Sequence, residues 1–464
     1  MKPEDGCRLS RAQSTLRAGC AARLLFAMLG GAVGCGDELS VGDVDPDFAD
    51  CPSGVPCAPP KIELPNDYVG LAARSSGVLA PVWSQTMSPN TYGARAGDGN
   101  LWLATVQGET IWVRRVDDRG AASQETTLAA PVAMPNTTVS PKVVSFSPHE
   151  KGPVLHVSWT HWVSHEVGCV GSSRATTAMG VSCASEFELL VLDGANLASP
   201  TRVDLCIGSG FCLPTGEVYR SGDGESLLSS RLQADGSTFT LVEQTLDGKV
   251  VSTSQIPWDF HALNGTAVGA HGWSLYGASS VAAGMPGGAR GLIGFERGGK
   301  PSVTYLQGAD ASGGGTGTGV VLPGPGPGQT IAVVERLAGD TGLGGGSRLA
   351  GDLAVVRLEG GVLQGQQVLT RQEYASLPLT AVGVDDAGTV YVLTATGDRD
   401  ATLNHTLTTL VCRLPVAAAG ACFQLPTPDA PDGLSLPRKG IYALRENVLI
   451  VNTGTQLARV DLPL

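Results

Sequence analysis

One pattern recurs along most of this chain: a segment of alternating apolar and polar residues, followed by a turn rich in Asp and Gly. The clearest copy reads Thr-Phe-Thr-Leu-Val-Glu-Gln-Thr-Leu-Asp-Gly-Lys-Val-Val from residue 238. Seven copies begin at residues 110, 188, 238, 291, 353, 408 and 455, so successive copies lie 47 to 78 residues apart, most of them near 50. Alternation predicts strands and a repeat of this length predicts an array of similar units, so each copy is expected to mark one unit.

A second element precedes several of these copies. Residues 97–105 and 384–394 each read as a turn followed by a strand with large apolar groups at alternate positions, and residues 221–229 are a weaker version. These segments would form inner hairpins, which gives four strands per unit. An array of this kind resembles a β-propeller, although the repeated Trp-Asp pair and the regular Gly-Gly signature of well-known propeller repeats are missing. We therefore expect an all-β fold with seven four-stranded blades; six or eight blades, or a double β-sandwich, are the alternatives.

The two ends of the repeat region predict how the ring closes. The seventh copy reaches Leu462 and is followed by no outermost strand, while an unassigned strand at residues 77–85 precedes the first full unit. If this strand completes the last blade, one strand from each end closes the ring and no sheet edge is left open there.

Composition agrees with many short strands and turns. The chain of 464 residues contains 63 Gly, only 5% of its residues are aromatic, and long runs of helical period are missing. The low-complexity stretches at residues 308–328 and 339–346 are expected to be loops, with a short strand at residues 320–322.

The N-terminus carries an export signal. A basic head is followed by a short apolar core at residues 24–29, which is too short to span a bilayer and is therefore expected to be cleaved. The small residues that end at Cys35 resemble the lipobox of bacterial lipoproteins. This resemblance implies cleavage before Cys35, lipidation of its thiol and new amine, and a location in the bacterial cell envelope; Gly36 favours the outer membrane. An ordinary secretory signal with an incidental cysteine is the alternative.

These features divide the chain into three parts: a signal peptide at residues 1–34, a lipidated flexible linker at 35–65, and the propeller-like domain at 66–464. The linker alternates acidic residues with Gly, Pro and Ser, and such a segment cannot bury enough apolar surface to fold. Its Asp43-x-Asp45-x-Asp47 run lacks the Gly and the distal Glu of a calcium loop, so we interpret it as a solvated acidic linker.

The charge of the exported chain argues against a nucleic-acid partner. The five basic and two acidic residues of residues 1–34 contribute +3, so the remaining chain carries −15 rather than the −12 of the whole sequence. A surface of this sign repels phosphate backbones. The membrane is expected to be contacted through the lipid, and an envelope protein or polysaccharide is the expected partner.

Cysteine usage agrees with export. Eight cysteines remain besides Cys35, and an even number in an oxidising compartment predicts disulfides. They fall into four pairs that are local in sequence, and the last pair would join the third and fourth strands of the sixth unit. A metal site is disfavoured because the spacings contain no Cys-x-x-Cys pair. The predicted pairs are Cys51–Cys57, Cys169–Cys183, Cys206–Cys212 and Cys412–Cys422.

Candidate catalytic and ligand-binding groups are few. Histidines gather near residues 149–165, but three converging ligands would be needed for a metal, and we favour ordinary polar roles for them. No Gly-x-Ser-x-Gly motif occurs. The paired acids Asp117-Asp118 and Asp385-Asp386 lie in turn contexts, where solvated turns are the simpler interpretation. The tryptophans could stack on a ligand, although packing between blades is the commoner role. They are Trp102, Trp112, Trp159, Trp162, Trp258 and Trp273.

No catalytic, cofactor-binding or metal-binding residue is therefore predicted. The leading hypothesis is a lipid-anchored, non-enzymatic propeller whose loops on one face bind a ligand or macromolecule. Two alternatives remain: an envelope enzyme of the glycosidase or lyase kind, with distant acidic or histidine residues around the central channel, and a structural envelope component. Fold alone does not decide among them.

Overall fold

The computed structural model describes about two thirds of the chain, and every regular element in this part is a β-strand. The chain divides into two compact units, residues 1–56 and 57–464, and the first lies outside the described residues. None of the described residues forms a helix of the length and hydrophobicity that a membrane span requires. The described ranges are 61–64, 70–96, 99–130, 138–162, 183–192, 201–204, 213–232, 239–255, 261–279, 289–307, 319–335, 352–370, 381–399, 405–426 and 440–463.

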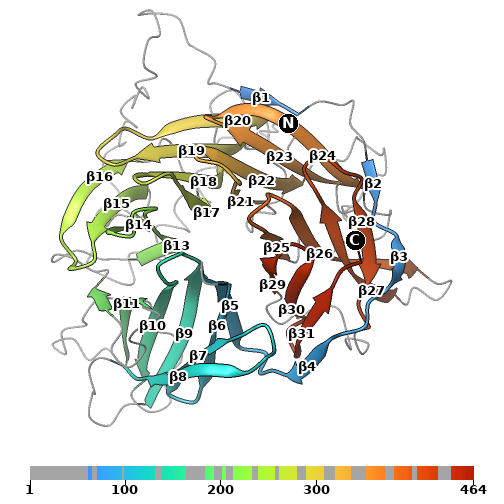
Figure 1. Ribbon diagram of the computed structural model, residues 1–464. Coiled ribbons are helices and arrows are strands. Elements are labelled where there is room, and N and C mark those ends of the chain that lie inside the picture. The colour runs from blue at the N-terminus through green and yellow to red at the C-terminus, as the bar shows by residue number, and fades with distance from the viewer. Residues whose placement is uncertain are drawn as a thin grey trace, which may run out of the picture. The chain divides into compact units, whose positions relative to one another are not determined.

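The second unit consists of seven antiparallel sheets arranged around a central axis, as Figure 1 shows. Blades 1 to 3 have four strands each, and consecutive strands run from the inside outward. Blade 1 contains β5 (Thr91–Arg95), β6 (Leu101–Gln107), β7 (Thr110–Val116) and β8 (Ala122–Leu128). Blade 2 contains β9 (Thr138–Ser147), β10 (Val154–Trp162), β11 (Cys183–Val191) and β12 (Thr201–Asp204). Blade 3 contains β13 (Leu213–Arg220), β14 (Ser226–Leu232), β15 (Phe239–Thr245) and β16 (Val250–Gln255).

Blades 4 to 6 repeat this order, and blade 7 has three strands from the C-terminal end of the chain. Blade 4 contains β17 (His261–Val268), β18 (Gly272–Ser279), β19 (Ala289–Glu296) and β20 (Ser302–Gln307). Blade 5 contains β21 (Gly319–Pro323), β22 (Gln329–Glu335), β23 (Leu353–Glu359) and β24 (Val362–Thr370). Blade 6 contains β25 (Ala381–Val384), β26 (Val390–Arg399), β27 (His405–Leu414) and β28 (Ala421–Gln424), and blade 7 contains β29 (Gly440–Arg445), β30 (Val448–Asn452) and β31 (Gln456–Asp461).

The innermost strands close the ring. Each of β5, β9, β13, β17, β21, β25 and β29 contacts the next, and β29 contacts β5. The predicted seven-bladed β-propeller is therefore confirmed. The seven repeat copies correspond to the third strands of the seven blades, from β7 to β31, and residues 97–105 and 384–394 contain the second strands β6 and β26.

The Asp/Gly turns fold because a carboxylate replaces missing backbone partners. In the turn between β7 and β8, Asp117 Oδ1 accepts hydrogen bonds from the N–H groups of Arg119 and Ala121, both at 2.9 Å. Gly120 has a φ of 80°, a conformation that residues with a Cβ rarely adopt. Asp385 folds the turn between β25 and β26 in the same way. Both acidic pairs therefore lie in turns, as the sequence predicts.

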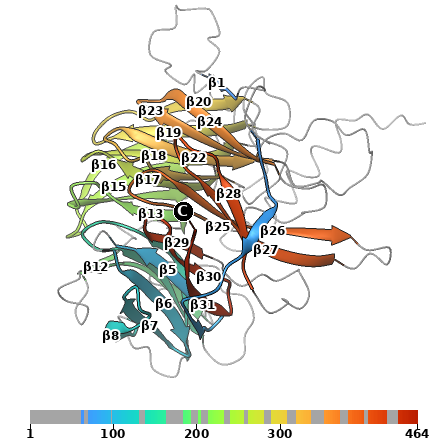
Figure 2. The same cartoon turned by 45° about the vertical axis from the view of Figure 1, so that its right-hand side comes forward.

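The N-terminal part of the propeller forms a strap along the outer edges of four consecutive blades (Figures 1 and 2). We define the strap as residues 61–64 and 70–86, which contain β1 (Lys61–Glu63), β2 (Gly70–Ala72), β3 (Ser75–Val78) and β4 (Trp83–Thr86). The first three pair in parallel with β20, β24 and β28, so blades 4 to 6 have five strands rather than the predicted four. β4 pairs antiparallel with β31 and is the fourth strand of blade 7.

The strap confirms the predicted closure and corrects its details. The single strand predicted at residues 77–85 is two strands, because the chain passes from β28 of blade 6 to β31 of blade 7 within it. β1 lies before the predicted domain boundary at residue 66. The chain turns between short segments since each blade presents a separate edge.

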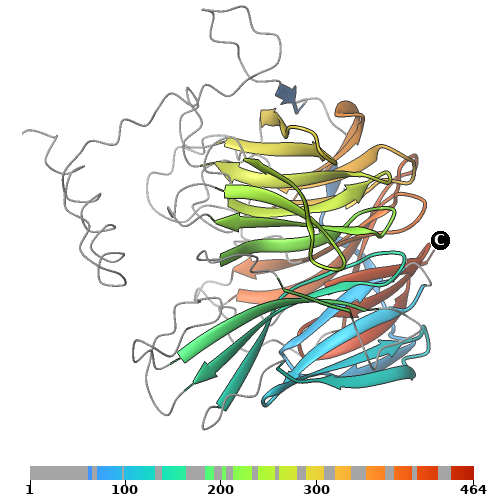
Figure 3. The same ribbon diagram turned by 90° about the vertical axis from the view of Figure 1, so that its left-hand side faces the viewer.

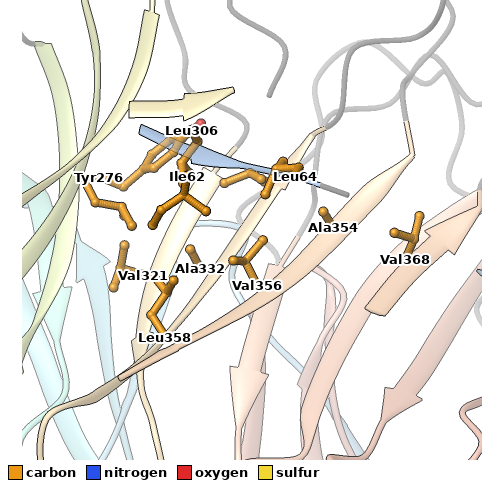
Figure 4. Close-up of a cluster of buried hydrophobic side chains, with 12 residues drawn as sticks. Ile62, Leu64, Tyr276, Leu306, Val321, Ala332, Ala354, Val356, Leu358 and Val368 are labelled. Carbon is orange, nitrogen blue, oxygen red and sulfur yellow. The ribbon is translucent and has the colours of Figure 1, made fainter. Parts of the chain in front are cut away.

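The strap also inserts apolar side chains between blades. Ile62 and Leu64 pack with residues of blades 4 and 5, among them Tyr276 and Val356 (Figure 4). Further along, the strap places apolar side chains in the next three contacts. Ala73 lies in the core between blades 5 and 6, Leu79 in that between blades 6 and 7, and Trp83 against that between blades 7 and 1. The strap is thus part of four successive cores.

Connections differ between the two faces of the ring, between which the strands run (Figure 3). We call the end with the first-to-second and third-to-fourth strand turns the turn face. Its connections are short, for example residues 96–100, 221–225 and 385–389, with 192–200 the longest. We call the opposite end the connection face. It carries most of the chain between strands, including residues 163–182, 308–318, 336–352 and 425–439.

Candidate functional site

Charged side chains gather on the turn face where blades 2, 3 and 4 meet. They come from the turn between β9 and β10, the turn between β13 and β14, the inner strand β15, and two turns of blade 4. The members of this polar cluster are His149, Lys151, Arg220, Asp223, Glu243, His271 and Arg297.

A buried ion pair forms the centre of the polar cluster. Arg297 Nε lies 2.6 Å from Glu243 Oε1, and the Glu243 side chain is fully buried. Ser226 Oγ donates to the same oxygen at 2.8 Å and accepts from Arg297 Nη2 at 2.8 Å, while Ser252 Oγ donates to Oε2 at 3.2 Å. Desolvation opposes the charge of Arg297, but the Glu243 carboxylate outweighs it and raises the Arg297 pKa. The pair joins blade 3 to blade 4.

Asp223 carries the second carboxylate of the cluster. Its Oδ1 accepts from Ser221 Oγ at 2.5 Å and from the Glu225 N–H at 3.0 Å. Its Oδ2 lies 3.3 Å from Arg297 Nη1 and 3.0 Å from His271 Nδ1. Desolvation alone would raise the pKa of Asp223, but these hydrogen bonds and the Arg297 charge lower it to about 2. Asp223 is therefore ionised at neutral pH.

His149 joins blade 2 to blade 3. Its Nδ1 accepts from the Lys151 N–H at 3.0 Å, so its Nε2 is the protonated nitrogen and donates to the Ser221 carbonyl at 2.8 Å. Burial, followed by the positive charge of Arg220, lowers the pKa of His149 to about 4. Lys151 Nζ donates to the Asp223 carbonyl at 2.5 Å.

The polar cluster therefore braces the ring. Both carboxylates are engaged by arginine and hydroxyl donors, and His149 is held neutral by its surroundings. A general acid or base needs a group that can exchange its proton with a substrate near neutral pH. Asp223 and His149 do not titrate in that range, so the arrangement is suited to binding three blades together rather than to acid–base chemistry.

The second acid of each predicted pair also joins blades. Asp118 Oδ2 lies 3.4 Å from Arg459 Nη1, which ties blade 1 to blade 7. Asp386 binds Arg95 Nη2 at 2.9 and 3.0 Å, which ties blade 6 to blade 1 past blade 7. These pairs are separated by hundreds of residues, and the sequence contains no signal for them.

The histidines do not converge on one point. His156 and His161 are buried at 0% and 1% exposure on opposite faces of β10, which agrees with the predicted alternation. His149 lies in the polar cluster, and His165 is outside the described residues. Among the described residues, no group of three or more His, Cys, Asp or Glu side chains could hold a metal ion.

Three tryptophans lie in the packing between blades. Trp102 and Trp159 are fully buried, and Trp273 is 2% exposed. Trp159 Nε1 donates to Glu188 Oε1 at 2.6 Å. Trp112 lies under the guanidinium of Arg114, whose carbon is 4.8 Å from the ring centre. The remaining two have side chains outside the described residues: Trp162 and Trp258.

One of the predicted disulfides is observed. Cys412 in β27 and Cys422 in β28 are bonded, across the third and fourth strands of blade 6 as predicted. Cys183 begins β11, but its predicted partner lies outside the described residues. The other predicted sites also lie outside them: Cys35, Cys51, Cys57, Cys169, Cys206 and Cys212.

Solved structures with a similar fold include proteins of very different function. Hydrazine synthase from Kuenenia stuttgartiensis is 11% identical, with 85% of this chain and 99% of that chain covered and a TM-score of 0.44. The β-propeller domain of the trilobed protease from Pyrococcus furiosus is 10% identical, with 82% and 95% covered and a TM-score of 0.40. Oligogalacturonate lyase from Vibrio parahaemolyticus is 9% identical, with 84% and 99% covered and a TM-score of 0.42.

These similarities concern the arrangement of blades and transfer no activity to this chain. No protein-family model and no curated relative matches the sequence.

Proposed function

We propose that this protein is a lipid-anchored binding propeller of the bacterial cell envelope, which contacts an envelope protein or polysaccharide through its connection face. The observation that carries the proposal is the difference between the two faces. The turn face is built from short turns whose charged groups bind one another, whereas the connection face carries the long stretches between strands. Binding residues are commonly held on loops that a rigid scaffold positions.

A projecting hairpin on the connection face supports this assignment. β26 and β27 pair over ten residues each, from Val390↔Leu414 to Arg399↔His405. Their neighbours β25 and β28 pair only with the four residues nearest the turn face, so the distal half of the hairpin extends beyond every described strand beside it (Figure 2). A paired ribbon of this kind offers backbone and side-chain groups to a partner.

The anchor and the partner class follow from the sequence. The lipobox-like end at Cys35 supports attachment to the outer membrane, and acyl chains bind a bilayer strongly when several act together. The charge of −15 that remains after removal of residues 1–34, which carry +3 of the total −12, disfavours nucleic acid. A non-enzymatic role fits the polar cluster, whose charged groups hold blades together.

The anchor is tested by intact mass. The full chain extracted from membranes should have the mass of residues 35–464 plus acyl groups, and the Cys35→Ala variant should lose the acyl groups and leave the membrane fraction. An unacylated, soluble wild-type protein would contradict the anchor.

The binding face is tested with a photo-crosslinking residue at matched positions. Glu109 and Asp247 are exposed acidic residues in short turns on opposite faces, the first on the connection face and the second on the turn face. In intact cells, the residue at position 109 should form a crosslinked product of higher mass, and the residue at position 247 should not. Crosslinks confined to position 247, equal crosslinks at both, or none at either would refute the proposed face.

A further inference from the structure

The disulfide of blade 6 lies in the core under the outer edge of the ring. Cys412 and Cys422 are directly opposite each other in the β27–β28 pair, and both side chains have 0% exposure. They belong to the apolar cluster between blades 5 and 6, together with Leu369 and Leu410. A thiol reductant must reach one sulfur of a disulfide to break it. In the folded ring, therefore, something must move before reduction.

The strap is the element that covers this disulfide. The strap passes from blade 5 to blade 6 at residues 72–75, where the Ala72 carbonyl lies 3.9 Å from Cys422 Sγ and Ser75 is paired with Cys422. Ala73 is 1% exposed within the same apolar cluster. Its N–H donates to the Thr370 carbonyl at 2.9 Å, which fixes the crossing point to β24.

We propose that the strap and the Cys412–Cys422 disulfide form a redox latch. While the strap is docked, a dithiol reductant cannot reach the sulfurs, so the disulfide is reduced only through states in which the strap has lifted. Conversely, the disulfide holds β28 against β27, and β28 is the strand on which β3 pairs. Reduction therefore loosens the template of β3 and favours release of the strap.

The chemistry is ordinary thiol–disulfide exchange with a dithiol. One thiolate of the reductant attacks Sγ of Cys412 or Cys422, the S–S bond breaks, and the other cysteine leaves as a thiolate. The second thiol of the reductant then attacks the mixed disulfide. The products are two cysteine thiols and an oxidised, cyclic reductant, which has supplied two electrons and two protons.

Release of the strap changes how far the ring can lie from whatever holds its N-terminus. Residues 61–82 precede β4, and in extended form they reach about 70–80 Å. This consequence rests on the lipid anchor proposed above, whereas the latch does not. The experiment below measures the latch in detergent solution, so its failure leaves the anchor untouched.

The test compares reduction rates in two strap variants of the full-length protein. Ala73→Asp places a charge in the buried crossing point. Val78→Asp introduces the same charge at a strap residue that is 66% exposed, and serves as the matched control. Samples are incubated with excess dithiothreitol, quenched with an alkylating reagent at intervals and digested with trypsin. Cleavage after Arg399, Arg413 and Arg438 separates the two cysteines, so their peptides stay joined only while the disulfide is intact.

We expect Ala73→Asp to be reduced at least about tenfold faster than wild type, because access limits the rate, and Val78→Asp to match wild type. Hydrogen exchange at residues 70–78 reports strap opening in the same samples. Faster exchange without faster reduction would overturn the proposal. If Ala73→Asp does not fold, Thr370→Val replaces it, because this change removes the hydroxyl that donates to the Leu71 carbonyl at 3.1 Å and keeps the shape of the side chain. The same two readouts decide the outcome.

The reverse coupling is tested with a Cys412→Ser/Cys422→Ser double variant. Loss of the disulfide should accelerate hydrogen exchange at residues 70–78, while exchange at β21 and β22 of blade 5, which do not contact the strap strands in the sheet order, stays as in wild type. Unchanged exchange at residues 70–78 would refute the second half of the latch.

Discussion

Substitution of Leu79 tests whether the strap is part of the cooperative fold. Leu79 and Val78 are neighbours in the strap with opposite environments: Leu79 is 5% exposed and Val78 is 66% exposed. Leu79 packs in the core between blades 6 and 7 with Phe423 and Leu462, and its N–H donates to the Gln424 carbonyl at 2.9 Å. Leu79→Ala removes buried methyl groups from the contact between two blades, and Val78→Ala removes methyl groups that are already in water.

The expected magnitudes follow from burial. Truncation of a buried leucine to alanine costs about 2–5 kcal/mol, and a position at the perimeter that can partly collapse should lie in the lower half of that range. Unfolding entropy of about 2.1 cal/mol/K per residue over roughly 400 residues then converts about 2–4 kcal/mol into a decrease in Tm of about 2–5 °C. Exposed substitutions usually change stability by less than about 0.5 kcal/mol, so Val78→Ala should leave Tm within about 1 °C of wild type.

Differential scanning calorimetry of the full-length protein gives the comparison directly. Equal Tm values for Leu79→Ala and wild type would show that the strap unfolds separately from the ring. A second transition at lower temperature in Leu79→Ala would show that blade 7 opens first. Either result would refute the claim that the strap stabilises the whole propeller as one cooperative unit.

Three further outcomes are expected. Arg297→Met should destabilise the protein by about 3–5 kcal/mol because it leaves the buried Glu243 carboxylate without its cation, whereas adding Glu243→Gln should recover much of that loss, as a double-mutant cycle from urea unfolding will show. Burial lowers the pKa of His149 to about 4, so its unfolded form binds a proton first; the free energy of unfolding should fall by about 2–3 kcal/mol between pH 6.5 and pH 4, and His149→Gln should remove this part of the pH dependence. Gly222→Ala should lower Tm clearly, because its Cβ would lie 1.9 Å from a carbonyl oxygen of the next blade, while Gly77→Ala, with no atom within 4 Å, should leave Tm unchanged or slightly raised; a similar Tm for both would show that the two turns can move apart.

Local patterns predict the blades because a blade is a local structure. The alternation at residues 238–251 and the Asp-Gly turn within it depend only on neighbouring residues, and this segment indeed forms β15, a turn and the start of β16. The same holds for the Cys412–Cys422 pair, whose members are ten residues apart across one hairpin. Repetition of such hairpins then determines the number of blades.

The polar cluster could not be predicted in this way. Arg297 and Glu243 are 54 residues apart in different blades, and each side chain alone resembles an ordinary turn or strand residue. The buried His156 and His161 are equally silent, because alternation shows which face a residue occupies but not which neighbouring blade covers that face. The proposed binding face rests on connection lengths, which depend on the assignment of strands to inner and outer positions.

By itself, the sequence determined the class of fold, the seven repeated units and the use of an N-terminal strand for closure, because short-range alternation and turn chemistry are written in consecutive residues. Only the tertiary structure decided the course of the strap. Its strands contain three or four residues each, which is too few for a periodic signal, and their partners lie more than 200 residues away. Whether such a segment forms a strand depends on an edge that exists only after the blades have formed, and on the gaps between blades that Ile62, Ala73 and Leu79 fill.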